Sequence, residues 1–253
     1  MRLLWLLPIL FATGFVAGFI DAIAGGGGLI TVPVLLGIGL PPQAALATNK
    51  LQSSFGSASA TWHYARAGLV HFRECRAGIG FTAAGALLGT SLVQWLPTDW
   101  LSRAIPVLLV LIALYQLFCP RFGAVDAQAR VGPGWFAAVC GLGLGFYDGF
   151  FGPGTGTFWA MAYLLGLGFN LTKATAHTKV MNFTSNVVSL AVFLAGHQVQ
   201  YAAGLVMGIG QMAGARAGSR SVIRRGAGLI RPVFLAVVLL LTFKLVRQAY
   251  FAP

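Results

Sequence analysis

The chain has 253 residues, of which 57% are hydrophobic and only 9% are charged. Soluble domains usually carry about 25% charged residues, so this composition excludes an ordinary water-soluble domain. Residues 3–20 contain no charged side chain, and about 20 apolar residues suffice for a helix to cross a bilayer. We therefore expect residues 1–253 to form a single all-α, polytopic transmembrane domain.

The formal net charge is +12, a balance that in a soluble protein suggests nucleic acid as a partner. Here the arginines gather in short loops between apolar segments, as the positive-inside rule describes. No nucleic-acid-binding motif accompanies them, so we expect no nucleic-acid partner. The three cysteines are an odd number without CxxC spacing, and the histidines lack metal-ligand spacing. We therefore expect no disulfide framework, no metal and no cofactor.

Apolar stretches and their interruptions predict five helical elements in each half of the chain. We place them at 2–24, 28–40, 43–64, 77–96 and 100–118, then at 133–151, 155–168, 172–195, 202–218 and 230–249. The second element of each half is short, about 20 Å long as a helix. It is compatible with a half-helix, a re-entrant hairpin or a thinly spanning segment. We therefore expect about eight to ten membrane segments.

The two halves share a sequence pattern that predicts an internal repeat. Residues 18–28 read GFIDAIAGGGG, and residues 145–155 read GFYDGFFGPGT, so that Asp21 corresponds to Asp148. With a two-residue shift, ATNK ending at Lys50 then corresponds to AHTK ending at Lys179. The chain has only five acidic residues, so the coincidence of these charges in one aligned block favours duplication. We expect residues 1–120 to form the first repeat and residues 132–250 the second.

The distribution of positive charge favours the larger number of segments. If the short elements cross, ten basic residues fall on one side and four on the other. If they do not cross, the same residues divide eight against six, which the positive-inside rule favours less. The ten are Arg66, Arg73, Arg76, Arg121, Arg130, Arg216, Arg220, Arg224, Arg225 and Arg231, and the four are Arg2, Arg103, Lys244 and Arg247. An odd number of crossings in each half would make the two repeats inverted.

The glycine runs that follow Asp21 and Asp148 predict broken membrane helices. Irregular backbone at membrane depth is tolerated where it is buried in protein or lines a wet cavity, and paired interruptions in inverted repeats indicate a transport site. The helix that follows a break presents free N–H groups, which suit an anion. The alternative is that these glycines only permit close helix packing. The candidate binding residues are Gly25, Gly26, Gly27, Gly28, Gly152, Gly154, Thr155 and Gly156.

Lys50 and Lys179 are the second group of candidates, because each lies early in a long apolar element. A charge inside a membrane is costly and usually has a partner or a task. The polar neighbours at about one-turn helical spacings from the lysines are Asn49, Gln52, Ser53, Thr178, Asn182 and Asn186. Thr48 and His177 precede the lysines in the two motifs and are candidates as well. We expect the two lysines to coordinate an anion. The alternatives are that they reach the headgroup region or pair with aspartates for structure alone.

Asp21 and Asp148 allow three roles: carboxylates that couple proton movement, counter-ions of the lysines, or caps of the following helix. His177 takes the place of a threonine of the first half and allows a proton relay or an ordinary hydrogen-bonding role.

The motifs GFIDAIAGGGGLITVPVLLGIGLPPQAALATNKLQSSFGS, GFYDGFFGPGTGTF and ATAHTKVMNFTSN resemble those of the sulfite exporter TauE/SafE family of bacterial permeases. The resemblance covers roughly residues 10–247. It implies a multi-pass protein of the bacterial inner membrane that transports small sulfur-containing anions such as sulfite, thiosulfate or sulfonates. The expected partners are thus a small anionic solute and the lipid bilayer, with proton or ion coupling and a homo-oligomer both left open.

A secondary transporter is the leading interpretation of these features. A passive anion channel and a membrane assembly factor without transport are the alternatives. We do not expect an enzyme, because no GxSxG, HExxH or similar catalytic signature occurs in the sequence.

Overall fold

A computed structural model describes residues 2–118 and 126–225, and these residues form nine helices with no strand among them. The helices are α1 (Arg2–Ala24), α2 (Gly28–Gly37), α3 (Pro42–Arg66), α4 (Phe72–Trp95), α5 (Thr98–Phe118), α6 (Pro133–Phe150), α7 (Thr155–Gly166), α8 (Leu171–Ala195) and α9 (Tyr201–Arg225). Nine of the ten expected elements are therefore present. The tenth, expected at 230–249, lies outside the described residues.

The largest differences from the expected bounds occur at two Arg-bearing helix ends. Helix α4 begins at Phe72 instead of residue 77, and α9 continues to Arg225 instead of ending at residue 218. Both extensions contain arginines, two in residues 72–76 and three in residues 219–225, which the sequence analysis assigned to loops. A helix can continue past the apolar region because long arginine side chains reach water or headgroups.

Four of the described helices are long and apolar enough to cross a membrane: α1 over Leu6–Ala24, α4, α5 over Thr98–Tyr115, and α8. Helices α3 and α9 have 25 residues each but lower mean hydropathy, and α3 has many buried polar side chains. Large apolar side chains also lie on the outside, including Trp95 and Trp135, which are 87% and 70% exposed. Tryptophan near helix ends is typical of a membrane interface.

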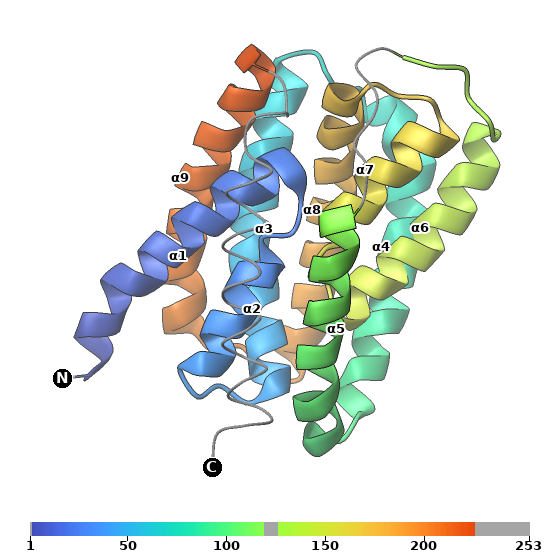
Figure 1. The fold of residues 1–253 in the computed structure, drawn as a ribbon. Coiled ribbons are helices and arrows are strands. Elements are labelled where there is room, and N and C mark those ends of the chain that lie inside the picture. Colours follow the sequence, from blue (N-terminus) through green and yellow to red (C-terminus); the bar gives the residue numbers. More distant parts are fainter. Residues whose placement is uncertain (1, 119–125, 226–253) are drawn as a thin grey trace.

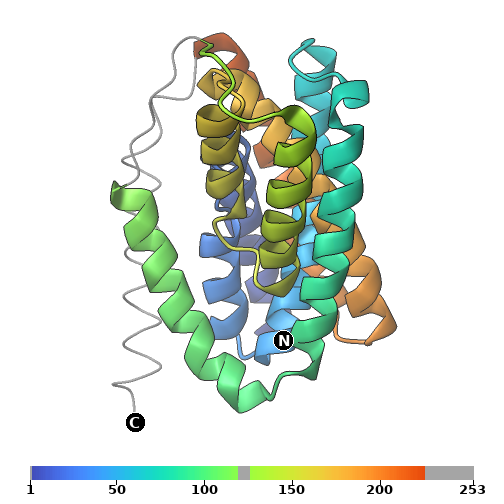
Figure 2. The ribbon, with the colours of Figure 1, turned by 90° about the vertical axis from the view of Figure 1, so that its right-hand side faces the viewer.

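The short helices α2 and α7 each reverse the direction of the chain (Figure 1). Helix α1 rises from the lower end of the molecule and α2 returns toward it, whereas α6 descends from the upper end and α7 returns upward. The ends of α3 and α9 and the starts of α4 and α6 lie at the upper end in this view. The arginines at the end of α3, at the start of α4 and at the end of α9 therefore share one side. Figure 2 shows α5 running along the outside of the bundle.

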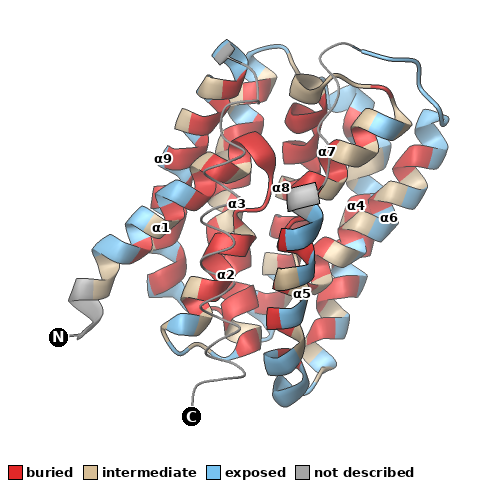
Figure 3. Ribbon diagram, in the orientation of Figure 1, coloured by how far each residue is buried: buried red, intermediate tan, exposed pale blue. Residues whose placement is uncertain are grey.

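Helices from opposite halves form the two closest pairs, α1 with α9 and α4 with α6. Glycines lie at both contacts: a Cβ on Gly214 would lie 1.9 Å from the Phe15 carbonyl oxygen, and one on Gly89 2.1 Å from that of Phe146. Small residues allow such close approach in membrane proteins. Helices α3 and α8 pack against each other between these pairs, and Figure 3 shows their inward surfaces buried. Helices α3 and α8, which carry the corresponding residues Lys50 and Lys179, therefore lie at the centre of the bundle.

Candidate functional site

The two glycine breaks contact each other at the centre of the bundle. Gly25 and Gly152 have φ values of +73° and +95°, a region that glycine reaches without strain. A Cβ on Gly25 would lie 2.5 Å from the carbonyl carbon of Gly156, so the first break needs glycine for close approach as well. The Thr157 hydroxyl donates to the carbonyl of Ala24 at 3.1 Å. The N-termini of α2 and α7 are thereby brought to one place.

Each buried lysine pairs with the aspartate of the opposite half. Lys50 Nζ lies 2.6 Å from Asp148 Oδ1, and Lys179 Nζ lies 2.9 Å from Asp21 Oδ2. The side chains of Lys50 and Lys179 are 1% and 0% exposed. Burial of an unpaired charge is strongly unfavourable, which explains why each ammonium has a carboxylate beside it. In the structure both aspartates are counter-ions of the lysines, one of the three roles that the sequence allowed.

The two carboxylates differ in their remaining partners. Asp21 Oδ1 accepts the backbone N–H groups of Gly26 and Gly27 at 3.1 and 3.2 Å, so it satisfies donors in the first glycine break. Asp148 instead accepts from the Ser185 hydroxyl, and its own carbonyl accepts from Lys50 at 2.5 Å. The Asp21 carboxylate thus occupies an arrangement of donors that suits an anion.

Polar side chains of α3 and α8 extend this cluster. Asn186 Oδ1 accepts from Lys50 Nζ at 3.3 Å. Asn49 Oδ1 accepts from the Thr31 hydroxyl at 2.6 Å and from Gln52 Nε2 at 2.7 Å. No described residue donates to the buried Asn182 Oδ1. The centre of the bundle therefore contains a connected polar network in an otherwise apolar protein.

A small cavity, which we call the central cavity, lies within this network and has a volume of about 20 Å³. Both halves contribute to its wall. Its lining residues are Asp21, Gly26, Gly28, Asn49, Ser53, Asp148, Gly152, Gly154, Thr155, Gly156, Asn182 and Asn186. All of these were named from the sequence, Asn186 as a polar neighbour of Lys179. A volume of this size accommodates roughly one water molecule.

Other candidates surround the central cavity without lining it. Gly25 and Gly27 belong to the first break. Lys50 and Lys179 lie directly behind the second break, since Cβ atoms on Gly152 and Gly156 would lie 3.0 and 3.5 Å from the respective Nζ atoms.

Three candidates from the sequence have contacts elsewhere. The Thr48 hydroxyl accepts the backbone N–H of Gln200 at 3.0 Å, and the Thr178 hydroxyl donates to the carbonyl of Ala174 at 2.8 Å. His177 Nδ1 lies 2.9 Å from the carbonyl of Lys173, and the ring lines a separate cavity of about 410 Å³, which we call the aromatic cavity. Although its sequence position places His177 beside Thr178 and Lys179, successive residues of a helix point in different directions.

Asn186 was named from the sequence as a polar neighbour of Lys179, two turns further along the same helix face, and the structure places it against Lys50 of the other half. Ser185 also belongs to the cluster, and nothing in the sequence singles it out. Within the described ranges, no three histidine, cysteine or acidic residues lie close enough together to hold a metal ion.

The model of the family described as sulfite exporter TauE/SafE matches residues 10–245. The chain belongs to the sulfite exporter TauE/SafE family. It is 45% identical over 245 residues to a probable membrane transporter protein, YfcA, of Escherichia coli K12, covering 97% of this chain and 91% of the relative. It is 47% identical to the probable membrane transporter protein ORF9 of a Sinorhizobium species, with 96% and 93% covered. No solved structure matches the chain significantly.

A probable membrane transporter protein of Haemophilus influenzae is 46% identical, with 95% of this chain and 94% of the relative covered. The match of whole chains, together with the apolar helices, makes this TauE/SafE member a membrane transporter. The names of these three relatives specify no solute.

Proposed function

We propose that this TauE/SafE member is a secondary transporter of small sulfur-containing anions, such as sulfite, thiosulfate or short sulfonates, in a bacterial inner membrane. The observation that carries the proposal is the meeting of both glycine breaks with two Lys–Asp pairs that join the two halves. Membership of a family described as sulfite exporters supports the substrate class.

An anion in the central cavity would find donors from both halves. The N-termini of α2 and α7 line this region through Gly28, Thr155 and Gly156, and they carry the positive ends of the two helix dipoles. The N–H groups of Leu29, Ile30, Thr155 and Thr157 already donate to carbonyls of the two breaks, so the dipoles contribute mainly through their positive potential. Asn49, Asn182 and Asn186 add side-chain amides. The two ammonium groups behind the glycines would contribute positive charge once their carboxylates release them.

The carboxylates supply a mechanism for coupling to protons. While Asp21 and Asp148 are ionised, they neutralise Lys179 and Lys50, so a transported anion gains little attraction from either ammonium. Protonation of a carboxylate removes its negative charge. The lysine beside it is then free to attract the transported anion. An anion and a proton would therefore bind together and cross the membrane together.

The size of the central cavity favours a carrier over an open pore. A volume of about 20 Å³ accommodates roughly one water molecule, whereas sulfite has four heavy atoms. The protein must rearrange before such an anion can enter. We propose that residues 1–120 and 132–250 are inverted repeats that move against each other. The opposed hairpins α1–α2 and α6–α7 and the reciprocal pairs α1–α9 and α6–α4 support this arrangement.

Flux measurements in proteoliposomes test the proposal. Sulfite, thiosulfate, sulfate and a short sulfonate are presented with and without an imposed proton gradient. The wild type is compared with Lys50→Ala/Lys179→Ala and with Lys173→Ala, a lysine of α8 that lies over the Phe169 ring, 4.1 Å from its centroid, instead of joining the ion pairs. Saturable flux of at least one sulfur anion that the double variant loses and Lys173→Ala retains is the expected result.

The alternatives predict different outcomes. A passive channel would give flux that neither saturates nor responds to the gradient. A membrane assembly factor would give no flux of any solute, and the double variant would be functionally silent. Either outcome contradicts the proposal.

A further inference from the structure

Helices α3 and α9, one from each half of the chain, lie side by side and run in the same direction (Figure 1). A Cβ on Gly208 would lie 2.8 Å from the Phe55 ring. Four residues later on both helices, the Ser59 hydroxyl donates to the carbonyl of Met212 at 3.0 Å. Both contacts join residues 153 positions apart, so the two helices keep the same register over at least this turn.

This register brings Arg66 of α3 to the height of Arg216 and Arg220 of α9. Arg66 follows Ser59 by two turns and Arg216 follows Met212 by one, so each lies on the same side of its helix as the residue before it. The contact between Ser59 and Met212 is itself exposed, and so are the three arginines. The three positive charges therefore gather on the outside of the bundle, where α3 and α9 meet.

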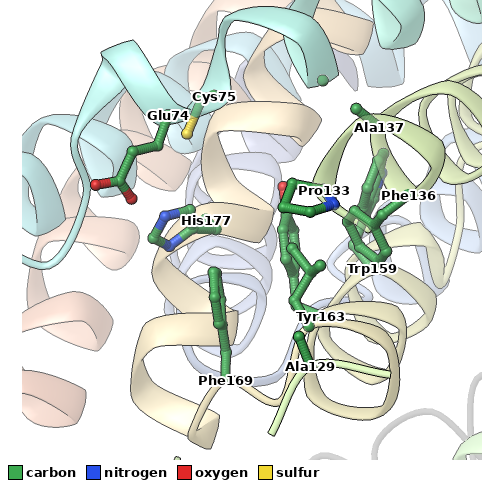
Figure 4. Close-up of a pocket in the computed structure, with 12 residues that line it drawn as sticks. Glu74, Cys75, Ala129, Pro133, Phe136, Ala137, Trp159, Tyr163, Phe169 and His177 are labelled. Atoms are coloured by element: carbon green, nitrogen blue, oxygen red, sulfur yellow. The ribbon is translucent and has the colours of Figure 1, made fainter. Parts of the chain in front are cut away.

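No carboxylate neutralises these arginines within residues 2–118 and 126–225, because none of the three forms an ion pair there. Glu74 also lies at the upper end of the bundle, but it belongs to α4 and lines the aromatic cavity, on the side where His177 lies (Figure 4). Helix α4 packs mainly on α6 and α8. Like charges one turn apart on a helix repel each other, so the arginines favour an anion from outside the described chain.

An apolar stripe continues this surface toward the start of α9. Leu205, Ile209 and Met212 follow one another at helical spacing, and all three are exposed. On α3, Trp62 is 61% exposed, and the Arg66 guanidinium lies over its ring, 5.8 Å from the centroid. Tryptophan and arginine near a helix end are typical of the headgroup region. The surface thus presents positive charge at headgroup depth and apolar side chains at the depth of acyl chains.

We propose that the outer surface of α3 and α9 binds an anionic phospholipid. Its phosphate would lie between Arg66 and Arg216, since a guanidinium can donate two parallel hydrogen bonds to a phosphate, and Arg220 would add positive charge. One acyl chain would follow the apolar stripe of α9. Basic sites between membrane helices bind acidic headgroups in this way. The lipid would contact both halves of the chain, and the site does not depend on the proposed anion transport.

The test measures lipid binding to the purified full chain by native mass spectrometry. The probes are phosphatidylglycerol and phosphatidylethanolamine with the same acyl chains, so they differ in net charge. Arg66→Gln/Arg216→Gln removes two charges of the proposed site. Arg73→Gln/Arg76→Gln is the matched control, because it removes two exposed arginines at the same end of the bundle, on α4. Glycerophosphoglycerol, which has the headgroup of phosphatidylglycerol without its acyl chains, is the soluble competitor.

The wild type should bind phosphatidylglycerol more tightly than phosphatidylethanolamine. Arg66→Gln/Arg216→Gln should weaken phosphatidylglycerol binding by roughly fivefold for each charge removed, while Arg73→Gln/Arg76→Gln binds like the wild type. Since all four positions are exposed, Tm should stay unchanged in both variants.

Three outcomes would overturn the proposal. Equal effects of the two double variants, or no effect of either, would show that the arginines of α3 and α9 form no separate site. Equal binding of the two lipids would show that the site does not select an acidic headgroup. Displacement of phosphatidylglycerol by an equal concentration of glycerophosphoglycerol would identify a soluble anion, instead of a lipid, as the occupant.

Discussion

The ammonium of Lys50, on α3, lies 2.6 Å from a carboxylate oxygen of Asp148, on α6. The pair of Lys179 with Asp21 repeats this relationship with the halves exchanged. Each half therefore supplies the carboxylate that neutralises the lysine of the other half, and separating the halves in this arrangement would leave all four charges without their partners. The pairs thus contribute to holding the halves together as well as to the electrostatics of the central cavity.

The first prediction concerns the stability of this pair. Lys50→Met leaves Asp148 buried beside an apolar side chain, and breaking a buried pair in this way typically costs about 3–5 kcal/mol. Lys50→Met/Asp148→Asn removes both charges and should recover most of the lost stability, because the neutral pair requires no counter-ion. The Tm values of the purified variants check this. A double variant no more stable than the single one would contradict the ion-pair explanation.

The second prediction concerns the pH dependence of flux. If protonation of the aspartates releases the lysines, wild-type flux at subsaturating anion should rise as pH falls. Asp148→Asn should flatten this dependence and give flux at high pH closer to the low-pH value, because its side chain no longer ionises. Asp99→Asn, which changes an exposed carboxyl in the first turn of α5, is the control. Unchanged pH dependence in both Asp148→Asn and Asp21→Asn would remove the aspartates from coupling.

The sequence predicted much of the central site because its residues repeat. The glycine breaks, Asp21 with Asp148 and Lys50 with Lys179 were all selected from two aligned motifs. The partners within the site were not decided, because a repeat identifies equivalent residues without telling whether a lysine pairs within its own half or across. That choice depends on how the halves pack, through α1 on α9 and α4 on α6.

His177 and Thr48 illustrate a second limit of sequence reasoning. Both adjoin site residues in sequence, but His177 faces the aromatic cavity and Thr48 accepts from the backbone of Gln200. A helix turns about 100° per residue, so side chains that are adjacent in a motif can point to different sides of the helix. The end of α9 was missed for another reason: hydropathy marks where a helix leaves the apolar region, and a helix rich in arginine can continue beyond it.

The third prediction concerns the contact between the two glycine breaks. A methyl group at Gly156 would lie 2.7 Å from the Gly25 Cα and 3.1 Å from Asn182 Nδ2. Gly156→Ala should therefore push the breaks apart and reduce flux strongly, while the protein still inserts. Gly37→Ala, at the end of α2, has no atom within 4 Å of the added Cβ and should transport like the wild type. Equal flux in the two variants would show that close approach of the breaks is unnecessary.

The last prediction concerns the helix pairs that join the halves. A Cβ on Gly214 would lie 1.9 Å from the Phe15 carbonyl oxygen; backbone atoms cannot swing aside as a side chain can, so Gly214→Ala must separate α9 from α1. Overpacking typically costs about 1–3 kcal/mol.

The matched control for this contact is Gly143→Ala, on α6, which meets no atom within 4 Å. It should be neutral or more stable by roughly 0.4–1 kcal/mol, because alanine restricts the unfolded chain. Thermal unfolding should therefore shift Tm in opposite directions, downward for Gly214→Ala and level or upward for Gly143→Ala. Gly89→Ala, at the corresponding contact of α4 with Phe146, should behave like Gly214→Ala if the two contacts are equivalent. A Gly214→Ala protein as stable as Gly143→Ala would mean that α1 and α9 can move apart without cost.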